Sequence, residues 1–467
     1  TDSNNQDNNE RTIANAAAIV QNGDVRGIYH KSFLPNYSVF DEARYFSKGT
    51  NSDTLFWYDD IAIGINICED IWIEDGPAED QVKQGASLII NINASPYDIQ
   101  KNETRKELVM KKALKLNVPI IYLNMVGGQD ELVFDGGSFV VNDLGEIIYQ
   151  ASSFQEEVFH LDIDLKIKKQ NSKSSLTTRP KTTELKDVKS KPSLSENESI
   201  YSALKLGLLD YVSKNKFTKV LIGISGGIDS ALTAAICVDA LGSENVLGVA
   251  MPSKYNSKES LEDAITLSDN LGINLKIIEI EKIVDSFREV LANSLKEELG
   301  QITDENIQSR VRGNILMGLS NQTGAMVVST GNKSEMAVGY STLYGDLAGG
   351  FALIKDLYKT KVYELSNYRN SISDAIPENI ISKEPSAELR PNQFDSDSLP
   401  DYEVLDKILN LYIEEDSSSE RIIASGVQPG LVYDVLEKVD RNEYKRKQVA
   451  PGVKLTQKAF GKDRRMP

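Results

Sequence analysis

Residues 222–230 read Ile-Gly-Ile-Ser-Gly-Gly-Ile-Asp-Ser, and this stretch decides the fold of the second half of the chain. The apolar run 220–224 is typical of a buried parallel strand, and residues 231–241 favour a helix. A strand, a glycine turn and a helix start form an anion site, because free N–H groups and the helix dipole face the bound phosphates. We therefore predict a phosphate loop, with Asp229 placed to hold a magnesium ion that bridges phosphate oxygens.

This loop differs from the Walker pattern, since no G-x-x-x-x-G-K-[ST] occurs in the chain. It resembles the SGG-x-DS loop of the ATP pyrophosphatases, which grips the pyrophosphate of ATP while the AMP moiety is transferred. A glycine-rich turn between a strand and a helix also occurs in proteins that bind no phosphate. The complete SGGIDS string in that setting favours the phosphate interpretation.

Composition limits the class of protein. A chain of 467 residues is too long for one core, so we expect two or three domains. Its net charge of −17 argues against a nucleic-acid partner, because nucleic acids bind to basic protein surfaces. No apolar run approaches the roughly 18–20 residues that span a bilayer, so we expect no membrane partner. Two cysteines cannot build a disulfide framework, which fits the reducing cytoplasm.

One stretch divides the chain. Residues 164–198 are rich in Lys, Ser, Thr and Pro and lack apolar periodicity, which is typical of a linker. Short apolar strands precede this stretch, and an α/β alternation typical of a parallel sheet follows it. The predicted parts are a first domain over residues 1–165, a linker over 166–196 and a second domain over 197–467.

Cys68 is the candidate nucleophile of the first domain. It follows the apolar strand 61–67 and enters a turn, and such a strand end gives a nucleophile the exposure it needs. A lone cysteine is more often a small buried hydrophobe. Lys31 favours the nucleophile, because a lysine beside a thiol lowers its pKa and stabilises a tetrahedral oxyanion.

The strings Tyr29-x-Lys-x-x-Leu-Pro-x-Tyr37 and Gly64-x-x-Ile-Cys-Glu-Asp70 resemble the nitrilase-like amidohydrolases, which use a Glu-Lys-Cys triad. The resemblance implies an α-β-β-α sandwich, with Cys68 attacking the side-chain amide of glutamine and Lys31 supporting the tetrahedral intermediate. It also implies a triad glutamate upstream of the lysine, after an early strand.

No residue of this sequence fills the position of that glutamate. The only carboxylates before Lys31 are Asp2, Asp7, Glu10 and Asp24, and none has the required setting. We therefore expect the general base, and the first part of the sandwich, to precede residue 1.

Three further positions match the branch of that family that feeds ammonia to a synthetase. By the resemblance, Tyr37, Ser95 and Lys101 hold the substrate glutamine. A hydroxyl and a cation suit the amino-acid end of glutamine. On the sequence alone, Lys101 could equally be a solvated surface lysine.

The second domain carries a polar helix and a glycine-rich stretch. Asn306 and Arg310 are four residues apart in a predicted helix, so they share a face. They could grip a carboxylate or phosphate, or form an ordinary solvated edge. Residues 328–351 follow a strand end, which is where open α/β sheets bind ligands. Glu335 in this stretch is a second carboxylate for magnesium, opposite Asp229.

Several strings together resemble the glutamine-dependent NAD⁺ synthetases. They are SGGIDS, ENIQ-x-R-x-RGN, STGNKSE-x-AVGYSTLYGD-x-AGGFA-x-IKD, PSAELRP and EYKRKQ, and with the strings of the first domain the resemblance extends over nearly all of the chain. The resemblance implies an α/β chain: a nitrilase-like sandwich, then a doubly wound parallel-sheet ATP-pyrophosphatase domain. In that family ATP adenylates the nicotinate carboxylate of deamido-NAD⁺, and ammonia then displaces AMP.

Site residues follow from the resemblance. Those implied for ATP are Gly223, Ile224, Ser225, Gly226, Gly227, Ile228, Asp229, Ser230, Thr330, Lys359 and Ser386. Those implied for deamido-NAD⁺ are Asn306, Arg310, Glu335, Tyr340, Ser341, Thr342, Leu343 and Lys445. Leu343 stands where shorter, ammonia-using synthetases have a lysine, so that charge contact is absent here. Asp229 and Glu335 are the implied Mg²⁺ ligands.

Two other classes stay open beside this one. The chain could be a different amidotransferase or ATP pyrophosphatase, or a nucleotide-binding protein without catalysis. The family also implies a homo-oligomer, with ATP, glutamine and deamido-NAD⁺ as small-molecule partners. The acidic stretch 414–420 is interpreted as a solvated loop.

Overall fold

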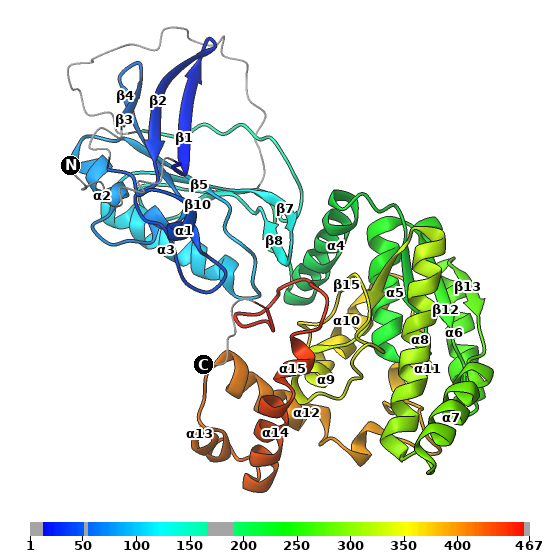
Figure 1. The fold of residues 1–467 in the computed structure, drawn as a ribbon. Coiled ribbons are helices and arrows are strands. Elements are labelled where there is room, and N and C mark those ends of the chain that lie inside the picture. The colour runs from blue at the N-terminus through cyan, green and yellow to red at the C-terminus, as the bar shows by residue number, and fades with distance from the viewer. Residues whose placement is uncertain (1–12, 51–54, 166–189, 462–467) are drawn as a thin grey trace, which may run out of the picture. The chain divides into compact units, whose positions relative to one another are not determined.

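The computed structural model describes residues 13–50, 55–165 and 190–461. They form two compact units (Figure 1). The first unit holds the described residues up to 127, with 134–165 and 190–194, and the second holds 128–133 and 195–461. Most of the predicted linker, residues 166–189, lies outside the described residues.

The first unit is built on a six-stranded sheet. In sheet order the strands are β10 (Ile147–Gln150), β9 (Phe139–Val141), β6 (Ile120–Asn124), β5 (Leu88–Asn93), β4 (Ile61–Ile67) and β3 (Leu55–Tyr58). The central strands β4, β5 and β6 run parallel, whereas β3 and β9 pair antiparallel at the sides. Parallel central strands are buried on both faces, which explains their near-continuous apolar sequences.

Helices and a hairpin complete this unit. The helices are α1 (Glu42–Tyr45), α2 (Pro77–Lys83) and α3 (Lys101–Leu116), and a 3₁₀ turn spans Cys68–Ile71. The hairpin pairs β1 (Ala16–Gln21) with β2 (Asp24–His30). A second hairpin pairs β7 (Val126–Gln129) with β8 (Leu132–Asp135), and residues 128–133 of this hairpin are counted with the second unit. Val109 and Ala113 of α3 pack on Ile89 and Ile120 of the sheet.

The second unit is built on a five-stranded, all-parallel sheet. In sheet order the strands are β13 (Asn274–Ile277), β12 (Val246–Ala250), β11 (Val220–Gly223), β14 (Met326–Ser329) and β15 (Phe351–Ala352). The chain moves outward from β11 to β13 and then returns to β14, so the strand order reverses between β11 and β14. The predicted α/β class with a doubly wound parallel sheet is confirmed.

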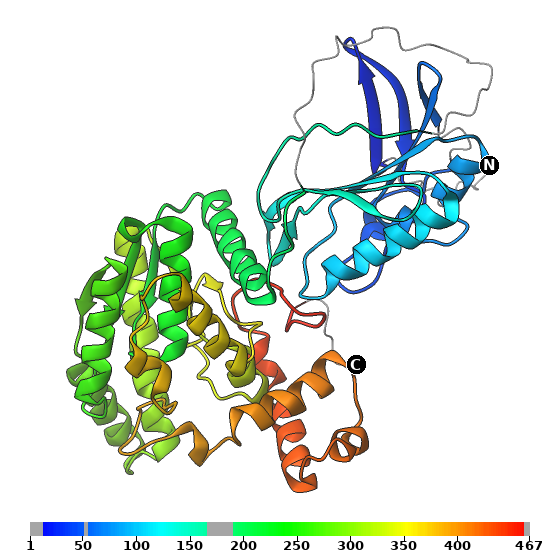
Figure 2. The same ribbon diagram turned by 180° about the vertical axis from the view of Figure 1, so that it is seen from behind.

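Helices cover both faces of this sheet (Figures 1 and 2). The helices that precede or follow its strands are α4 (Glu196–Lys214), α5 (Ile228–Leu241), α6 (Lys258–Leu271), α7 (Glu281–Leu295), α8 (Gln301–Thr323), α9 (Lys333–Val338) and α10 (Lys359–Ile372). The core beneath α7 and α8 joins Val284, Ile307 and Val311 to Leu221 and Val327 of the sheet. No described helix is long and apolar enough to cross a membrane.

Further helices follow toward the C-terminus. They are α11 (Glu378–Ser382), α12 (Tyr402–Leu409), α13 (Ser419–Ala424), α14 (Pro429–Arg441) and α15 (Glu443–Arg446). Their core packs against α9, because Ala337 and Val338 share one cluster with Leu405, Val432 and Val435. The helix α9 therefore links the sheet to this helical region.

A buried lysine ties this region together. The Lys333 side chain has no solvent exposure, and its Nζ lies 2.6 Å from Asp356 Oδ1, 2.5 Å from Glu414 Oε1 and 2.7 Å from Thr456 Oγ1. Glu414 ends a π-helical turn, Asn410–Glu414, that continues α12. The interpretation of 414–420 as a solvated loop was wrong for Glu414, because its carboxylate neutralises a cation 81 positions away.

We expect Lys333→Met to lower the free energy of unfolding by about 3–5 kcal/mol, because it leaves two buried carboxylates without their cation. Arg441→Met is the matched control, since it breaks an exposed pair with Glu437 on one helix turn. Urea unfolding followed by circular dichroism measures both. Equal midpoints for the two variants would contradict the structural role of Lys333.

Candidate active sites

The predicted phosphate loop lies between β11 and α5. The Ser230 hydroxyl accepts a hydrogen bond from Ser225 N at 3.2 Å and lies 2.9 Å from Gly227 O, to which it donates. Gly226 has a φ of +80°, and a Cβ there would lie 2.2 Å from Ser260 O. The turn therefore requires glycine at 226, and Ser230 braces it from inside.

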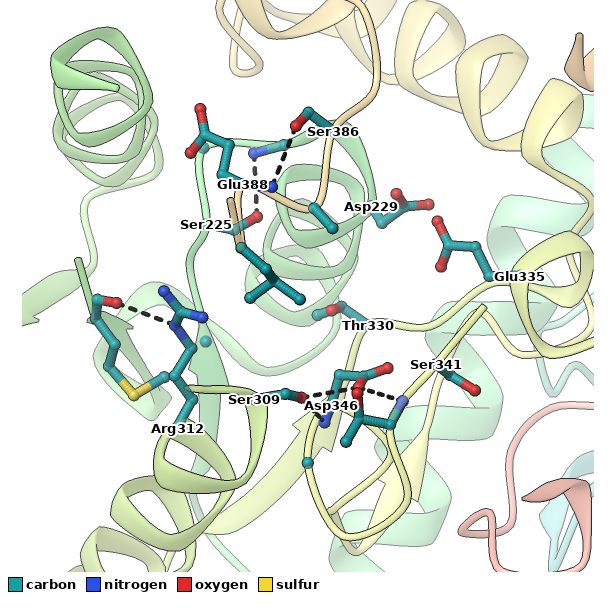
Figure 3. A pocket seen from close by; sticks show the side chains of 18 of the residues that line it. Ser225, Asp229, Ser309, Arg312, Thr330, Glu335, Ser341, Asp346, Ser386 and Glu388 are labelled. Carbon is teal, nitrogen blue, oxygen red and sulfur yellow. Dashed lines mark hydrogen bonds between the residues drawn. The ribbon is translucent and has the colours of Figure 1, made fainter. Parts of the chain in front are cut away.

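This loop opens into a cavity of about 610 Å³ in the second unit (Figure 3). The cavity lies at the carboxyl ends of β11, β12 and β14, where the strand order reverses, which is the usual ligand position in such sheets. Many predicted residues line it: Gly223 to Asp229, Asn306, Thr330, Glu335, Tyr340, Ser341, Thr342, Lys359, Ser386 and Lys445. Ser230, Arg310 and Leu343 are not among the lining residues.

Two carboxylates and one lysine form the charged centre of the cavity. Lys359 Nζ lies 2.5 Å from Asp229 Oδ2 and 3.2 Å from Glu335 Oε1. Figure 3 shows the two carboxylates pointing toward one another. Burial raises the pKa of Glu335, and the charge of Lys359 opposes that rise. A cation or a phosphate-bound metal near Asp229 and Glu335 would favour their ionised forms over their protonated forms.

The residues present fit a divalent cation only in part. Asp229 and Glu335 supply the hard oxygen donors that Mg²⁺ prefers. The described residues contain no cluster of three His, Cys, Asp or Glu side chains with metal-site geometry. Magnesium usually keeps water or substrate phosphate oxygens among its ligands, so two carboxylates are compatible with it.

Asn306 and Arg310 contact one loop, as their predicted shared face implies. Asn306 Oδ1 accepts a hydrogen bond from Thr342 Oγ1 at 2.8 Å, and Arg310 Nε donates to Leu343 O at 3.2 Å. Lys445 Nζ donates to Ser341 O at 2.8 Å. Arg310 and Lys445 therefore hold the backbone of the loop 339–346.

Other polar residues in the cavity were missed by the sequence analysis. Arg312 Nε donates to Met251 O at 3.1 Å, and its Nη2 lies 3.1 Å from Asn256 Oδ1. Glu388 accepts hydrogen bonds from Asn256 and Ser260. The quoted R-x-RGN string contained Arg312, but helical spacing places it away from the face shared by Asn306 and Arg310. Only the fold reveals its partners.

In the first unit, Cys68 lies directly after β4 with a φ of +44°. The side chain is 7% exposed and packs with Tyr29 and Ile67. Burial raises the pKa of the thiol to about 11, although the Lys31 charge opposes the rise. The predicted strand-end position is correct, but the expected exposure of Cys68 was wrong. A positive φ at a non-glycine residue is strained and is common at functional sites.

Lys31 is almost fully buried, and its partner is a residue that we did not predict. Lys31 Nζ lies 2.6 Å from Glu42 Oε1 and 2.8 Å from Oε2. Glu42 opens the short helix α1. The charges of Lys31, Glu69, Glu42 and Arg105 act on the Cys68 thiol, so these groups belong to one site.

The three residues predicted to hold glutamine have different surroundings. Tyr37 OH donates to Glu69 at 3.0 Å, and Cys68 affects its pKa, so Tyr37 lies near the thiol. Ser95 Oγ accepts from Arg105 Nε at 3.1 Å. Lys101 Nζ lies 4.6 Å from the centre of the Trp72 ring, a cation–π contact.

Arg105 was missed because its importance comes from long-range contacts. It is 1% exposed, and its Nη1 pairs with Asp135 at 2.7 and 2.9 Å. Its Nη2 donates to the carbonyls of Ser95 and Pro96, which fixes the loop after β5. In the sequence, Arg105 is one of several basic residues of a helix, and nothing distinguishes it from the others.

Comparison with known proteins defines the class of this chain. A NAD synthase family model matches residues 200–449, and a carbon-nitrogen hydrolase family model matches residues 3–169. The glutamine-dependent NAD(+) synthetase of Aquifex aeolicus is 48% identical over 98% of this chain and 83% of the relative. That of Thermotoga maritima is 49% identical over 97% of this chain and 82% of the relative.

A solved structure agrees with these relatives. The glutamine-dependent NAD⁺ synthetase from Acinetobacter baumannii, in complex with adenosine diphosphate, has a TM-score of 0.72 at 44% identity, over 97% of this chain and 81% of that one. The class is thus a carbon-nitrogen hydrolase joined to a NAD synthase. The chain belongs to the glutamine-dependent NAD(+) synthetase family.

We expect Gly226→Ala to weaken ATP binding at least tenfold, which corresponds to about 1.4 kcal/mol. The added methyl group would meet Ser260 O, and alanine disfavours a positive φ. Gly318→Ala in α8 is the control, because a Cβ there meets nothing within 4 Å. Titration calorimetry with a non-hydrolysable ATP analogue measures both. Unchanged affinity in Gly226→Ala would exclude this turn from the phosphate site.

Proposed function

We propose that the second unit amidates deamido-NAD⁺ to NAD⁺ through an adenylate, with ammonia that the first unit releases from glutamine. The observation that carries this proposal is the SGGIDS loop, whose Asp229 shares Lys359 with Glu335 in one cavity. A carboxylate is a poor electrophile, and AMP makes it a good one. ATP is therefore a co-substrate, and the family assignment supports its use.

The lining of the cavity supports the division of its residues between two substrates. Residues 223–230 form the loop for the ATP phosphates, where Ser230 braces rather than contacts them. Thr330, Lys359 and Ser386 are the further ATP residues. Asn306, Glu335, Tyr340, Ser341, Thr342 and Lys445 surround deamido-NAD⁺. Arg310 and Leu343 act through the loop 339–346, because neither lines the cavity.

Magnesium is the proposed metal, with Asp229 and Glu335 as its protein ligands. When bound, Mg²⁺ would neutralise charge on the ATP phosphates. Lys359 holds both carboxylates in the cavity and keeps their charges from repelling one another. Asn332 Nδ2 donates to Asp229 Oδ1 at 2.9 Å, which fixes the orientation of that carboxylate.

In the first unit, Cys68 is the proposed nucleophile for the glutamine amide, and Lys31 stabilises the oxyanion of the tetrahedral intermediate. Tyr37, Ser95 and Lys101 hold the substrate. Arg105 supports this role for Ser95, because it fixes the serine hydroxyl and its carbonyl. The general base of the proposed triad, a glutamate in the nitrilase-like amidohydrolases, is not assigned to any residue of this sequence.

The nitrogen source separates the two reactions. We expect Cys68→Ala to reduce glutamine-driven NAD⁺ formation by about a thousandfold or more, while ammonium chloride still supports it. Asp229→Asn should stop synthesis with both sources. Formation of NAD⁺ from deamido-NAD⁺, ATP and magnesium chloride is the measurement.

Cys237→Ala is the matched control, because this second thiol is fully buried in α5, away from the cavity lining. Loss of both activities in Cys68→Ala would contradict the division of labour. Synthesis with ammonium alone in the unmodified chain would keep the assignment of the second unit and show that the first unit is incomplete or inactive in this form.

We further propose a homo-oligomer in the cytoplasm. Both cysteines are free thiols, which fits a reducing compartment. On α7, the apolar side chains of Ile283, Phe287 and Val290 share one face and are 41%, 44% and 66% exposed. An apolar face of this kind suits a second copy of the chain.

We expect the double change Phe287→Lys with Val290→Lys to give monomers, because it places charge in the apolar face. Glu289→Lys on the same helix is the control for added positive charge. Light scattering after size exclusion measures the mass. An unchanged mass in the double variant would place any interface elsewhere.

A further inference from the structure

Asp70 lies two residues after Cys68 and has no solvent exposure. Its carboxylate accepts four hydrogen bonds. Oδ1 accepts from Ser32 N at 3.1 Å and Phe33 N at 2.9 Å, and Oδ2 accepts from Ile67 N at 3.0 Å and Tyr29 OH at 2.7 Å. An ionised carboxylate has about four acceptor positions, so the described donors use all of them.

These four bonds join two segments of the chain. Ser32 and Phe33 directly follow Lys31, whereas Ile67 directly precedes Cys68. The Asp70 carboxylate therefore joins the backbone next to Lys31 to the backbone next to Cys68. It also holds the residue before the strained φ of Cys68, at +44°.

Apolar packing would not require a carboxylate at the buried position of Asp70. Burial raises the pKa of Asp70, and the hydrogen bonds from Tyr29, Ile67 and Phe33 oppose that rise. A buried carboxylate costs free energy unless such donors compensate it. The donors are mostly backbone N–H groups, which only an acceptor satisfies.

Asp70 is not placed to act on the thiol as a base. The charges that act most strongly on Cys68 are those of Lys31, Glu69, Glu42 and Arg105. Both oxygens of Asp70 are already occupied by donors from other groups. The geometry therefore gives Asp70 a role in the position of the two segments, and its charge has an effect of opposite sign that the experiment separates.

We propose that Asp70 is the positioning residue of the glutaminase site, where it holds Lys31 beside Cys68. This inference rests on the proposed roles of those two residues. An asparagine would present an NH₂ group to backbone N–H donors on one side, so at least one clamp bond would be lost. The segment carrying Lys31 would then move relative to the thiol.

The pKa of Cys68 tests this inference. Removal of the Asp70 charge and displacement of Lys31 would shift that pKa in opposite directions. Loss of the nearby Lys31 cation destabilises the thiolate and raises the pKa of Cys68. Removal of a negative charge, by itself, stabilises the thiolate and lowers that pKa. We expect Asp70→Asn to raise it, with about a tenfold smaller thiolate fraction at a given high pH.

NMR of the chain labelled with ¹³Cβ-cysteine, titrated from pH 7 to pH 11, is the measurement. The chain has two cysteines, and the fully buried Cys237 has a pKa raised by burial, so one signal reports Cys68. Lys31→Met is the reference for loss of the cation. Glu69→Gln is the matched control, since it removes a negative charge beside the thiol that raises its pKa.

The inference holds if Asp70→Asn shifts the Cys68 titration upward, like Lys31→Met, while Glu69→Gln shifts it downward. It is overturned if Asp70→Asn leaves the titration unchanged or lowers it while Lys31→Met raises it. No rise in Lys31→Met would instead contradict the proposed role of Lys31. If Asp70→Asn does not fold, Asp70→Glu replaces it, because that change keeps the charge and moves only the carboxylate.

Discussion

The ammonium group of Lys359 is the contact on which the synthetase site depends. It lies between Asp229 near the start of α5 and Glu335 in α9, while Lys359 itself begins α10. Three helices are thus fixed at one point, directly beside the phosphate loop. Without that cation, the two carboxylates would repel one another at the position where the three helices meet.

A buried lysine organises each of the other centres as well. Lys31 is paired with Glu42 beside the thiol, and Lys333 is paired with Asp356 and Glu414 behind the cavity. Each ammonium group is almost fully desolvated, and each is compensated by at least one carboxylate partner. Removal of one partner from such a pair costs far more than the pair itself contributes. These pairs specify positions, while the apolar clusters of the two sheets supply most of the folding free energy.

The sequence predicts features that depend on local pattern, and it misses those that depend on distant partners. The strand 61–67, the helix after residue 227 and the phosphate turn follow from apolar periodicity and glycine placement, and all three agree with the structure. Glu42, Arg105 and Arg312 look like ordinary charged residues in a helix, because their roles come from tertiary contacts. Arg105 meets Asp135, which lies 30 positions away. The burial of Cys68 also depends on Tyr29, which no local pattern brings to the strand end.

The buried state of Cys68 explains why the glutaminase chemistry needs more than a cysteine and a lysine. A thiol with a pKa of about 11 is ionised to about one part in ten thousand at pH 7. The thiolate, not the thiol, is the reactive form of a cysteine, so burial alone makes Cys68 a weak nucleophile. Lys31 Nζ is occupied by both carboxylate oxygens of Glu42, so its proposed role is support of the oxyanion and not removal of the proton. If Cys68 has the proposed role, its deprotonation requires a separate base that acts as glutamine binds, as the glutamate of a Glu-Lys-Cys triad would.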